Sequence, residues 1–180
     1  MKTLTLIIKQ KWFDEIIAGR KKEEYRDCKP TTESRYIETD ADGYAVLDEN
    51  GVPVLKKYDA IRFYVGYAKD RDSALVEVKG ARIEDAFDEK GDLIEYAVVD
   101  GQYFDLKMLN AMRKTEFKPG ELTKSDERVK QLADNLLIDD PEDGFAINDE
   151  WADAHPEVDF WSPGIVTYEL GEILEKKVKG

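Results

Sequence analysis

The sequence predicts an α+β fold, in which helices flank a small mixed or antiparallel β-barrel that carries a helical, acidic insertion. Three observations lead to this prediction. A strand-like run at residues 3–9 is followed at once by a short amphipathic helix at 10–18. Alternating apolar and polar residues at 60–67 and 74–83 predict two further strands. A last alternating run at 164–178 predicts a closing strand.

The first elements have the clearest local signals. Threonine and leucine alternate in residues 3–9 before an apolar pair, which is typical of a strand. Apolar residues then recur at helical spacing, namely Trp12, Phe13, Ile16 and Ile17. Gly19 follows and is a favourable residue just beyond a helix end. We expect this helix to bury its apolar face, Trp12 included, and a short strand to follow at 23–26.

Turn residues organise the middle of the chain. Residues 38–54 contain Asp-Gly and Asn-Gly pairs, which predict a hairpin excursion. The strands at 60–67 and 74–83 are separated by a charged turn.

The second half predicts two helices and a long loop. Helical spacing of apolar residues indicates a helix at 103–114. Thr123 opens a capping sequence for a helix that runs to Leu136. Residues 139–159 are read as an acidic loop. We therefore expect one domain over residues 1–180, in which the first and last strands pair to close the barrel and residues 100–160 form the insertion.

Charge is distributed unevenly along the chain. The formal net charge is −13, yet residues 1–80 hold 15 basic and 15 acidic side chains, so they are neutral. Residues 134–159 hold ten carboxylates and no lysine or arginine. The acidic half disfavours binding along a whole duplex. A local anion site near the N-terminal end remains compatible with this pattern.

Several classes of function are disfavoured by composition. A single cysteine, Cys28, allows no disulfide within the chain, and no apolar stretch reaches membrane length, so we expect a cytoplasmic protein without membrane contact. The sequence lacks a phosphate-binding glycine loop and a dinucleotide-binding glycine motif. The one histidine, His155, is followed by proline, so we do not expect it to act as the base of a conventional triad, and with a single cysteine it supplies no ligand set for zinc. We therefore predict no cofactor and no metal site.

The most informative segment is 12–26. A helix ends at glycine, several cations follow immediately, and a strand carries Glu24 and Arg26 two residues apart. Residues at this spacing share one face of a strand. Lysine at a helix end can hold a phosphate, and arginine can bind one through two parallel hydrogen bonds. The same residues could instead form only surface ion pairs.

This segment resembles the opening of an ASCH domain, a member of the PUA-like superfamily. The family pattern is a strand, a helix that ends in an isoleucine and a glycine, a lysine, and then a glutamate and an arginine on a strand. The matching residues of this chain are Ile16, Gly19, Lys21, Lys22, Glu24 and Arg26. The resemblance covers the N-terminal third well and the middle strands loosely, and residues 86–160 have no counterpart in the minimal domain.

The resemblance implies a binding module that recognises RNA or a modified nucleotide in a charged barrel cleft. The ligand would be short or single-stranded. Its candidate binding residues are Lys21, Lys22, Arg26, Tyr25, Tyr64 and Tyr67, with the tyrosines as stacking platforms for a base.

Two alternatives stay open at this point. Some relatives resemble amidohydrolases that use a lysine, a threonine and a glutamate; Lys21 and Glu77 match two of these positions, and Glu24 replaces the threonine. A hydrolase on a modified nucleoside, or a ribonuclease, would use Lys21, Glu77 and Glu24 as catalytic residues. A protein-interaction module would use the acidic segment 134–159 to bind a partner.

Overall fold

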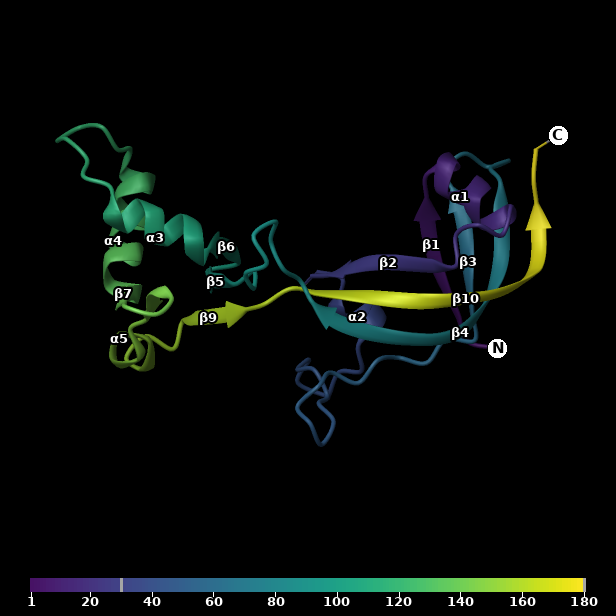
Figure 1. The fold of residues 1–180 in the computed structure, drawn as a ribbon, viewed down its shortest axis with the longest axis horizontal. Helices are drawn as coiled ribbons and strands as arrows, with labels where there is room; N and C mark the ends of the chain where they lie inside the picture. Colours follow the sequence, from purple (N-terminus) through teal and green to yellow (C-terminus); the bar gives the residue numbers. More distant parts are fainter. Residues whose placement is uncertain (30, 180) are drawn as a thin grey trace. The chain divides into compact units, whose positions relative to one another are not determined.

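The chain forms two compact units in the computed structural model, which describes residues 1–29 and 31–179. The first unit comprises Met1–Asp85 with Gly164–Gly180, and the second comprises Ala86–Pro163. Over the described residues strands predominate over helices, so the predicted α+β class is confirmed (Figure 1). The predicted insertion at 100–160 lies inside the second unit.

The first unit is organised around one five-stranded sheet with the order β1-β3-β4-β10-β2. Its strands are β1 (Thr3–Ile8), β2 (Glu23–Cys28), β3 (Ala60–Val65), β4 (Ser73–Asp85) and β10 (Gly164–Lys177). Two helices accompany the sheet, α1 (Gln10–Ile17) and α2 (Glu33–Tyr36). Figure 1 shows β10 running between β2 and β4. All five strands lie where alternation in the sequence predicted them.

The pairing of the strands differs from the prediction. β1 runs parallel to β3, whereas β10 pairs antiparallel with both β4 and β2. The expected pairing of the first strand with the last is therefore wrong, because β4 and β2 already occupy both edges of β10. The two edge strands, β1 and β2, form no backbone ladder within the described residues, so a closed PUA-like barrel is not confirmed.

Arginine side chains cover the outer edge of β1. Arg35 donates a hydrogen bond to the carbonyl oxygen of Thr5 at 2.6 Å. Arg26, on β2, donates one to the carbonyl oxygen of Ile7 at 3.0 Å. These side chains satisfy carbonyl groups that a further strand would otherwise bind, which is one way proteins protect an exposed sheet edge.

The core of the first unit explains why α1 forms where it does. Phe13 and Ile16 are buried against the sheet, as their helical spacing predicted. Trp12 does not follow them: 44% of its surface is exposed, so its predicted place in the core is wrong. Helix α1 is only eight residues long and turns Trp12 to the solvent side.

The predicted excursion at 38–54 is present as a set of turns rather than as strands. Isolated bridges join Ile37 to Leu55, Thr39 to Ala45 and Leu47 to Pro53. The carboxylates of Asp40 and Asp48 each accept two backbone hydrogen bonds at the turns.

The second unit contains more regular structure than the sequence suggested. It holds strands β5 (Tyr96–Val99), β6 (Gln102–Asp105), β7 (Leu137–Asp140), β8 (Gly144–Ile147) and β9 (Val158–Trp161). Its helices are α3 (Leu106–Lys114), α4 (Lys124–Leu136) and α5 (Asp149–Asp153). The second of these confirms the predicted cap, because the side chain of Thr123 accepts a hydrogen bond from the backbone of Asp126.

Two predictions in this unit are wrong. Residues 103–105 belong to β6, because the turn at Asp100-Gly101 folds them back onto β5. The acidic loop at 139–159 contains a hairpin, a helix and a strand. In that segment Phe145, Ile147 and Trp151 pack against a separate apolar core. Carboxylates outnumber these apolar residues in the segment, so no regular apolar spacing was apparent in the sequence. No helix among the described residues is long and apolar enough to cross a bilayer.

Candidate functional site

The turn after α1 determines where the N-terminal lysines point. Gly19 adopts a φ of 76°, a conformation that glycine accepts without strain. The carbonyl oxygen of Glu15 accepts backbone hydrogen bonds from both Arg20 and Lys21. Arg20 then pairs with the carboxylate of Glu15 through two hydrogen bonds of 2.8 Å. The next two residues, Lys21 and Lys22, connect this turn to β2.

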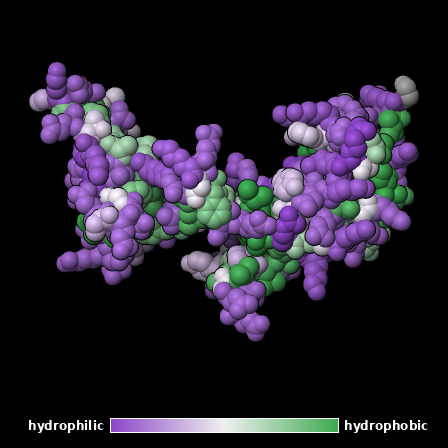
Figure 2. Space-filling view, in the orientation of Figure 1, coloured by the Kyte–Doolittle hydropathy of each residue, from purple (hydrophilic) through white to green (hydrophobic). Residues whose placement is uncertain are grey.

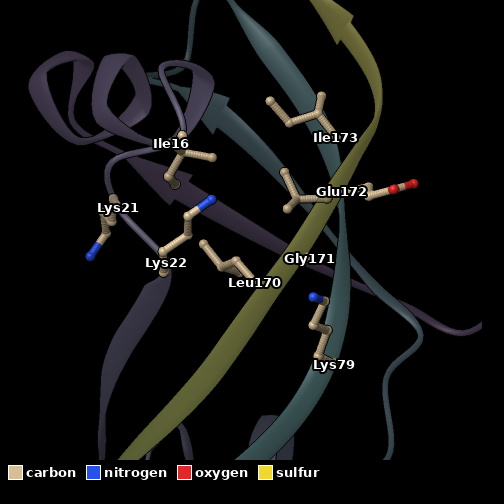
Figure 3. Close-up of a pocket in the computed structure, with 10 residues that line it drawn as sticks. Ile16, Lys21, Lys22, Lys79, Leu170, Gly171, Glu172 and Ile173 are labelled. Atoms are coloured by element: carbon tan, nitrogen blue, oxygen red, sulfur yellow. The ribbon is translucent and has the colours of Figure 1, made fainter.

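A cavity of about 430 Å³ opens beside this turn. Its apolar lining includes Ile16, Val76, Leu170 and Ile173, and its polar lining includes Lys21, Lys22, Lys79 and Glu172. Figure 3 shows the ammonium groups of Lys22, just before β2, and of Lys79, on β4, directed into it, whereas the carboxylate of Glu172 points outward. No ion pair within the described residues involves Lys22 or Lys79. The cavity therefore combines an apolar floor with two lysines that form no ion pair within the described residues.

Lys21 contributes to the cavity wall but directs its ammonium group elsewhere (Figure 3). Its Nζ lies 3.8 Å from Oε2 of Glu24. The other carboxylate oxygen, Oε1, lies 3.4 Å from Nε of Arg26. The structure thus brings together three of the predicted site residues, with Glu24 in the middle. Both separations exceed the length of a strong charged hydrogen bond.

Glu24 is buried, with 7% of its surface exposed. Burial raises the pKa of this carboxyl group above its ordinary value, and the nearby Arg26 and Lys21 oppose the rise only in part. Oε2 of Glu24 and Nε of Arg26 are buried without a hydrogen-bond partner in the part of the chain that the structure describes. The hydroxyl of Tyr168, on the neighbouring strand β10, is in the same condition. Such a group of unsatisfied polar atoms is unusual in a folded interior and marks a site of bound water or ligand.

Two aromatic rings enclose the ammonium group of Lys21. Its Nζ lies 5.5 Å from the ring centre of Trp12 and 5.2 Å from that of Tyr25. Both rings are substantially exposed, at 44% and 54%. The hydroxyl of Tyr25 donates a hydrogen bond to Glu23. Aromatic surface is therefore available next to the cation cluster, as a stacking site requires.

Glu77 lies apart from this cluster. It sits on β4, and no hydrogen bond or ion pair among the described residues joins it to Lys21, Glu24 or Arg26. Its carboxylate packs directly on the backbone of Gly171 in β10, where any Cβ would collide with it, and Cε of Lys79 lies 3.1 Å from the same position. The catalytic use of Lys21 with Glu77 stays a prediction.

The remaining predicted residues differ in their surroundings. Tyr64 stacks under the guanidinium of Arg71, whose carbon lies 3.9 Å from the ring centre. Tyr67 is 84% exposed and lies beyond the end of β3. Neither tyrosine lines the cavity. Their role in stacking a base is neither supported nor excluded by these positions.

Two residues of the site were missed at the level of sequence. Lys79 follows Glu77 on the polar face of β4, so alternation could have placed it with Glu77. Trp12 was assigned to the core by helical spacing, although it stands at the edge of the apolar face. The exposure of Trp12 depends on how α1 sits on the sheet.

The two units differ strongly in charge. The first carries 19 basic and 20 acidic side chains, and the second carries 8 basic and 20 acidic side chains. Nearly all of the net charge of −13 therefore belongs to the second unit. Figure 2 shows hydrophilic residues covering most of the visible face of residues 86–163. The first unit itself therefore adds almost no net repulsion of anions.

No group of three or more histidine, cysteine or acidic side chains is arranged to hold a metal ion in residues 1–29 and 31–179. Cys28 is buried, and burial raises the pKa of its thiol to about 11, which makes it a poor nucleophile. Comparison of the chain with protein-family models, curated proteins and solved structures finds no match. The resemblance to ASCH domains therefore stays a prediction from residues 12–26.

Proposed function

We infer that the first unit is an ASCH-type, PUA-like binding module for a nucleotide-like ligand, such as a short single-stranded RNA. The observation that carries this proposal is the cavity beside α1, where Lys22 and Lys79 direct their ammonium groups over an apolar floor. Cations of this kind bind phosphate, and an apolar floor accepts the uncharged part of the same ligand.

The aromatic rings that flank Lys21 favour a nucleotide over a simple anion. Trp12 and Tyr25 are exposed and flank Lys21, whose backbone turn forms part of the cavity wall. A base that stacks on one of these rings contributes about 1–3 kcal/mol to binding, whichever of the bases it is. The near-neutral first unit leaves the local lysines as the dominant electrostatic feature.

The experiment is a titration of a short RNA oligonucleotide that lacks a terminal phosphate, with binding monitored by fluorescence anisotropy. Lys22→Ala and Lys79→Ala are each expected to weaken binding by about tenfold and to reduce the salt dependence, because each removes one phosphate contact. Lys57→Ala is the matched control, since Lys57 is exposed on the same unit and lies outside the cavity lining. Equal loss in all three variants would point to nonspecific attraction and contradict the proposal.

A further inference from the structure

A pair of cations next to the cavity is already occupied by a carboxylate of the same chain. Glu24 lies between Lys21 and Arg26, at 3.8 Å and 3.4 Å. Nη2 of Arg26 donates a hydrogen bond to the carbonyl oxygen of Ile7. In this arrangement the position that a phosphate of a ligand would take between the two cations is filled by Glu24.

The carboxylate is poorly accommodated where it stands. Only 9% of its side-chain surface is exposed, and its Oε2 atom has no hydrogen-bond partner among the described residues. Both separations exceed the length of a strong charged hydrogen bond, so the attraction compensates burial of the charge incompletely. Burial without full compensation is the expected signature of a group that an incoming ligand can displace or neutralise.

The position of Lys21 links this carboxylate to the cavity. Lys21 lines the cavity wall, yet its ammonium points away from the cavity toward Glu24 (Figure 3). Lys22, its neighbour, points inward. Two of the three lysines that line the cavity therefore point into it, whereas the ammonium group of the third, Lys21, lies beside the carboxylate of Glu24.

We propose that Glu24 is an internal competitor for the anionic ligand, which holds Lys21 and Arg26 in an ion pair and thereby limits phosphate binding beside the cavity. This inference rests on the proposed function, because it concerns the same site. Removing the charge of Glu24 leaves two half-buried cations without a counter-charge, and an anion from solution then takes its place.

The test compares Glu24→Gln, Lys21→Met and the double variant with the wild-type chain, using the same RNA that lacks a terminal phosphate. Glu24→Gln is expected to bind about tenfold more tightly than wild type. In the Lys21→Met background the same substitution is expected to gain much less, which a double-mutant cycle measures directly. Thermal unfolding of each variant establishes that the comparison concerns folded protein.

A second measurement needs no substitution at the site. Four side chains lie around the carboxylate of Glu24. They are Lys21 in the turn after α1, Arg26 on the same strand as Glu24, Tyr168 on β10 and Tyr36 on α2. Burial raises the pKa of the Tyr36 and Tyr168 hydroxyls above the ordinary value, so both stay neutral over the mildly acidic range. Phosphodiesters keep their charge there. Wild-type affinity is therefore expected to rise as the pH falls and Glu24 is protonated, and the affinity of Glu24→Gln is expected to change less.

The outcomes separate the two proposals. Weaker or unchanged binding by Glu24→Gln, with Lys22→Ala and Lys79→Ala still harmful, overturns the competitor role and leaves the proposed function standing. In that case Glu24 accepts a hydrogen bond from the ligand or serves only the fold. Failure of both wild type and Glu24→Gln to bind RNA overturns the proposed function, and the competitor role with it.

Discussion

Glu24 and Gly171 are the residues whose environments depart most from what their types prefer. Glu24 is a buried carboxylate with loosely held partners. Gly171 lies in the long strand β10, where a register shift occurs, and its missing side chain leaves room for the carboxylate of Glu77. Each departure suggests a substitution with a predictable effect on stability.

Glu24→Gln is expected to stabilise the protein at neutral pH. The pKa of Glu24 is raised above its ordinary value of 4.5 in the folded chain, so the fold favours the protonated form. Ionisation as the pH rises through the folded pKa therefore costs stability, and a neutral glutamine avoids this cost. Chemical unfolding at several pH values measures it: the advantage of the variant should be largest above the folded pKa and vanish below the ordinary value. A variant that is less stable at neutral pH would contradict this account.

Gly171→Ala is expected to destabilise the protein by about 1 kcal/mol, the low end of the usual range for overpacking, because the nearest atoms are the ends of flexible side chains. The added methyl group would displace the carboxylate of Glu77 and press on Lys79. Gly80→Ala is the control, because the nearest atom there is the end of the Glu169 side chain at 3.3 Å, which can move aside. Urea unfolding of both variants decides the matter. Equal stability of the two would show that Glu77 rearranges freely.

At the scale of elements, local capping and edge protection determine which segments are well formed. Helix α4 begins at a threonine cap and carries acidic residues in its first turn, both of which stabilise a helix N-terminus. The outer edge of β1 is covered by Arg26 and Arg35 instead of a strand. These devices act within one element and can be tested there.

Thr123→Ala is expected to lower the stability of the second unit by about 1 kcal/mol through loss of the cap of α4. The hydroxyl of Thr123 accepts the backbone hydrogen bond of Asp126 at 3.1 Å. Ser125→Ala serves as the control, because Ser125 is exposed in the same turn and makes no side-chain hydrogen bond within the described residues. Hydrogen exchange of the α4 amides is the readout. Similar protection in both variants would argue that packing of Ala133 and Leu136, rather than the cap, holds the helix.

Local signals in the sequence were sufficient for most elements of the first unit. Alternation placed β1, β3 and β4, and the glycine after α1 placed the end of that helix. Pairing was harder, because the choice between β3 and β10 as the partner of β1 depends on contacts far apart in sequence. The second unit was misread because its apolar residues, such as Phe145 and Trp151, are sparse among carboxylates.

The candidate site was predicted only in part, because some of its residues are close in sequence and others are distant. Lys21, Glu24 and Arg26 are close in sequence, so strand geometry alone placed them together. Glu77 and Lys79 come from a strand that is distant in the chain. Their relation to the N-terminal cations depends on the order β4-β10-β2, which the sequence pattern did not reveal.

For the whole molecule, the central feature is the separation of charge between two units with separate cores. The second unit carries 20 acidic against 8 basic side chains, so repulsion among its own charges opposes its folding. The first unit is nearly neutral and holds the cavity. The proposed binding and the self-repulsion therefore belong to different parts of the chain.

Added salt is expected to stabilise the second unit more than the first, because it screens this repulsion. Hydrogen exchange at low and at high ionic strength measures the two units separately. Protection should rise in α3 and α4 and change little in β4 and β10. Equal changes in both units would contradict an electrostatic origin.

The central claim, that the cavity beside α1 receives a nucleotide-like ligand, is tested most directly by mapping where the ligand binds. Titration of the isotope-labelled chain with the short RNA should shift the backbone amide signals of Gly19, Lys22, Lys79 and Gly171 most strongly. Shifts that concentrate in residues 86–163, or that are absent throughout at saturating RNA, would contradict the account.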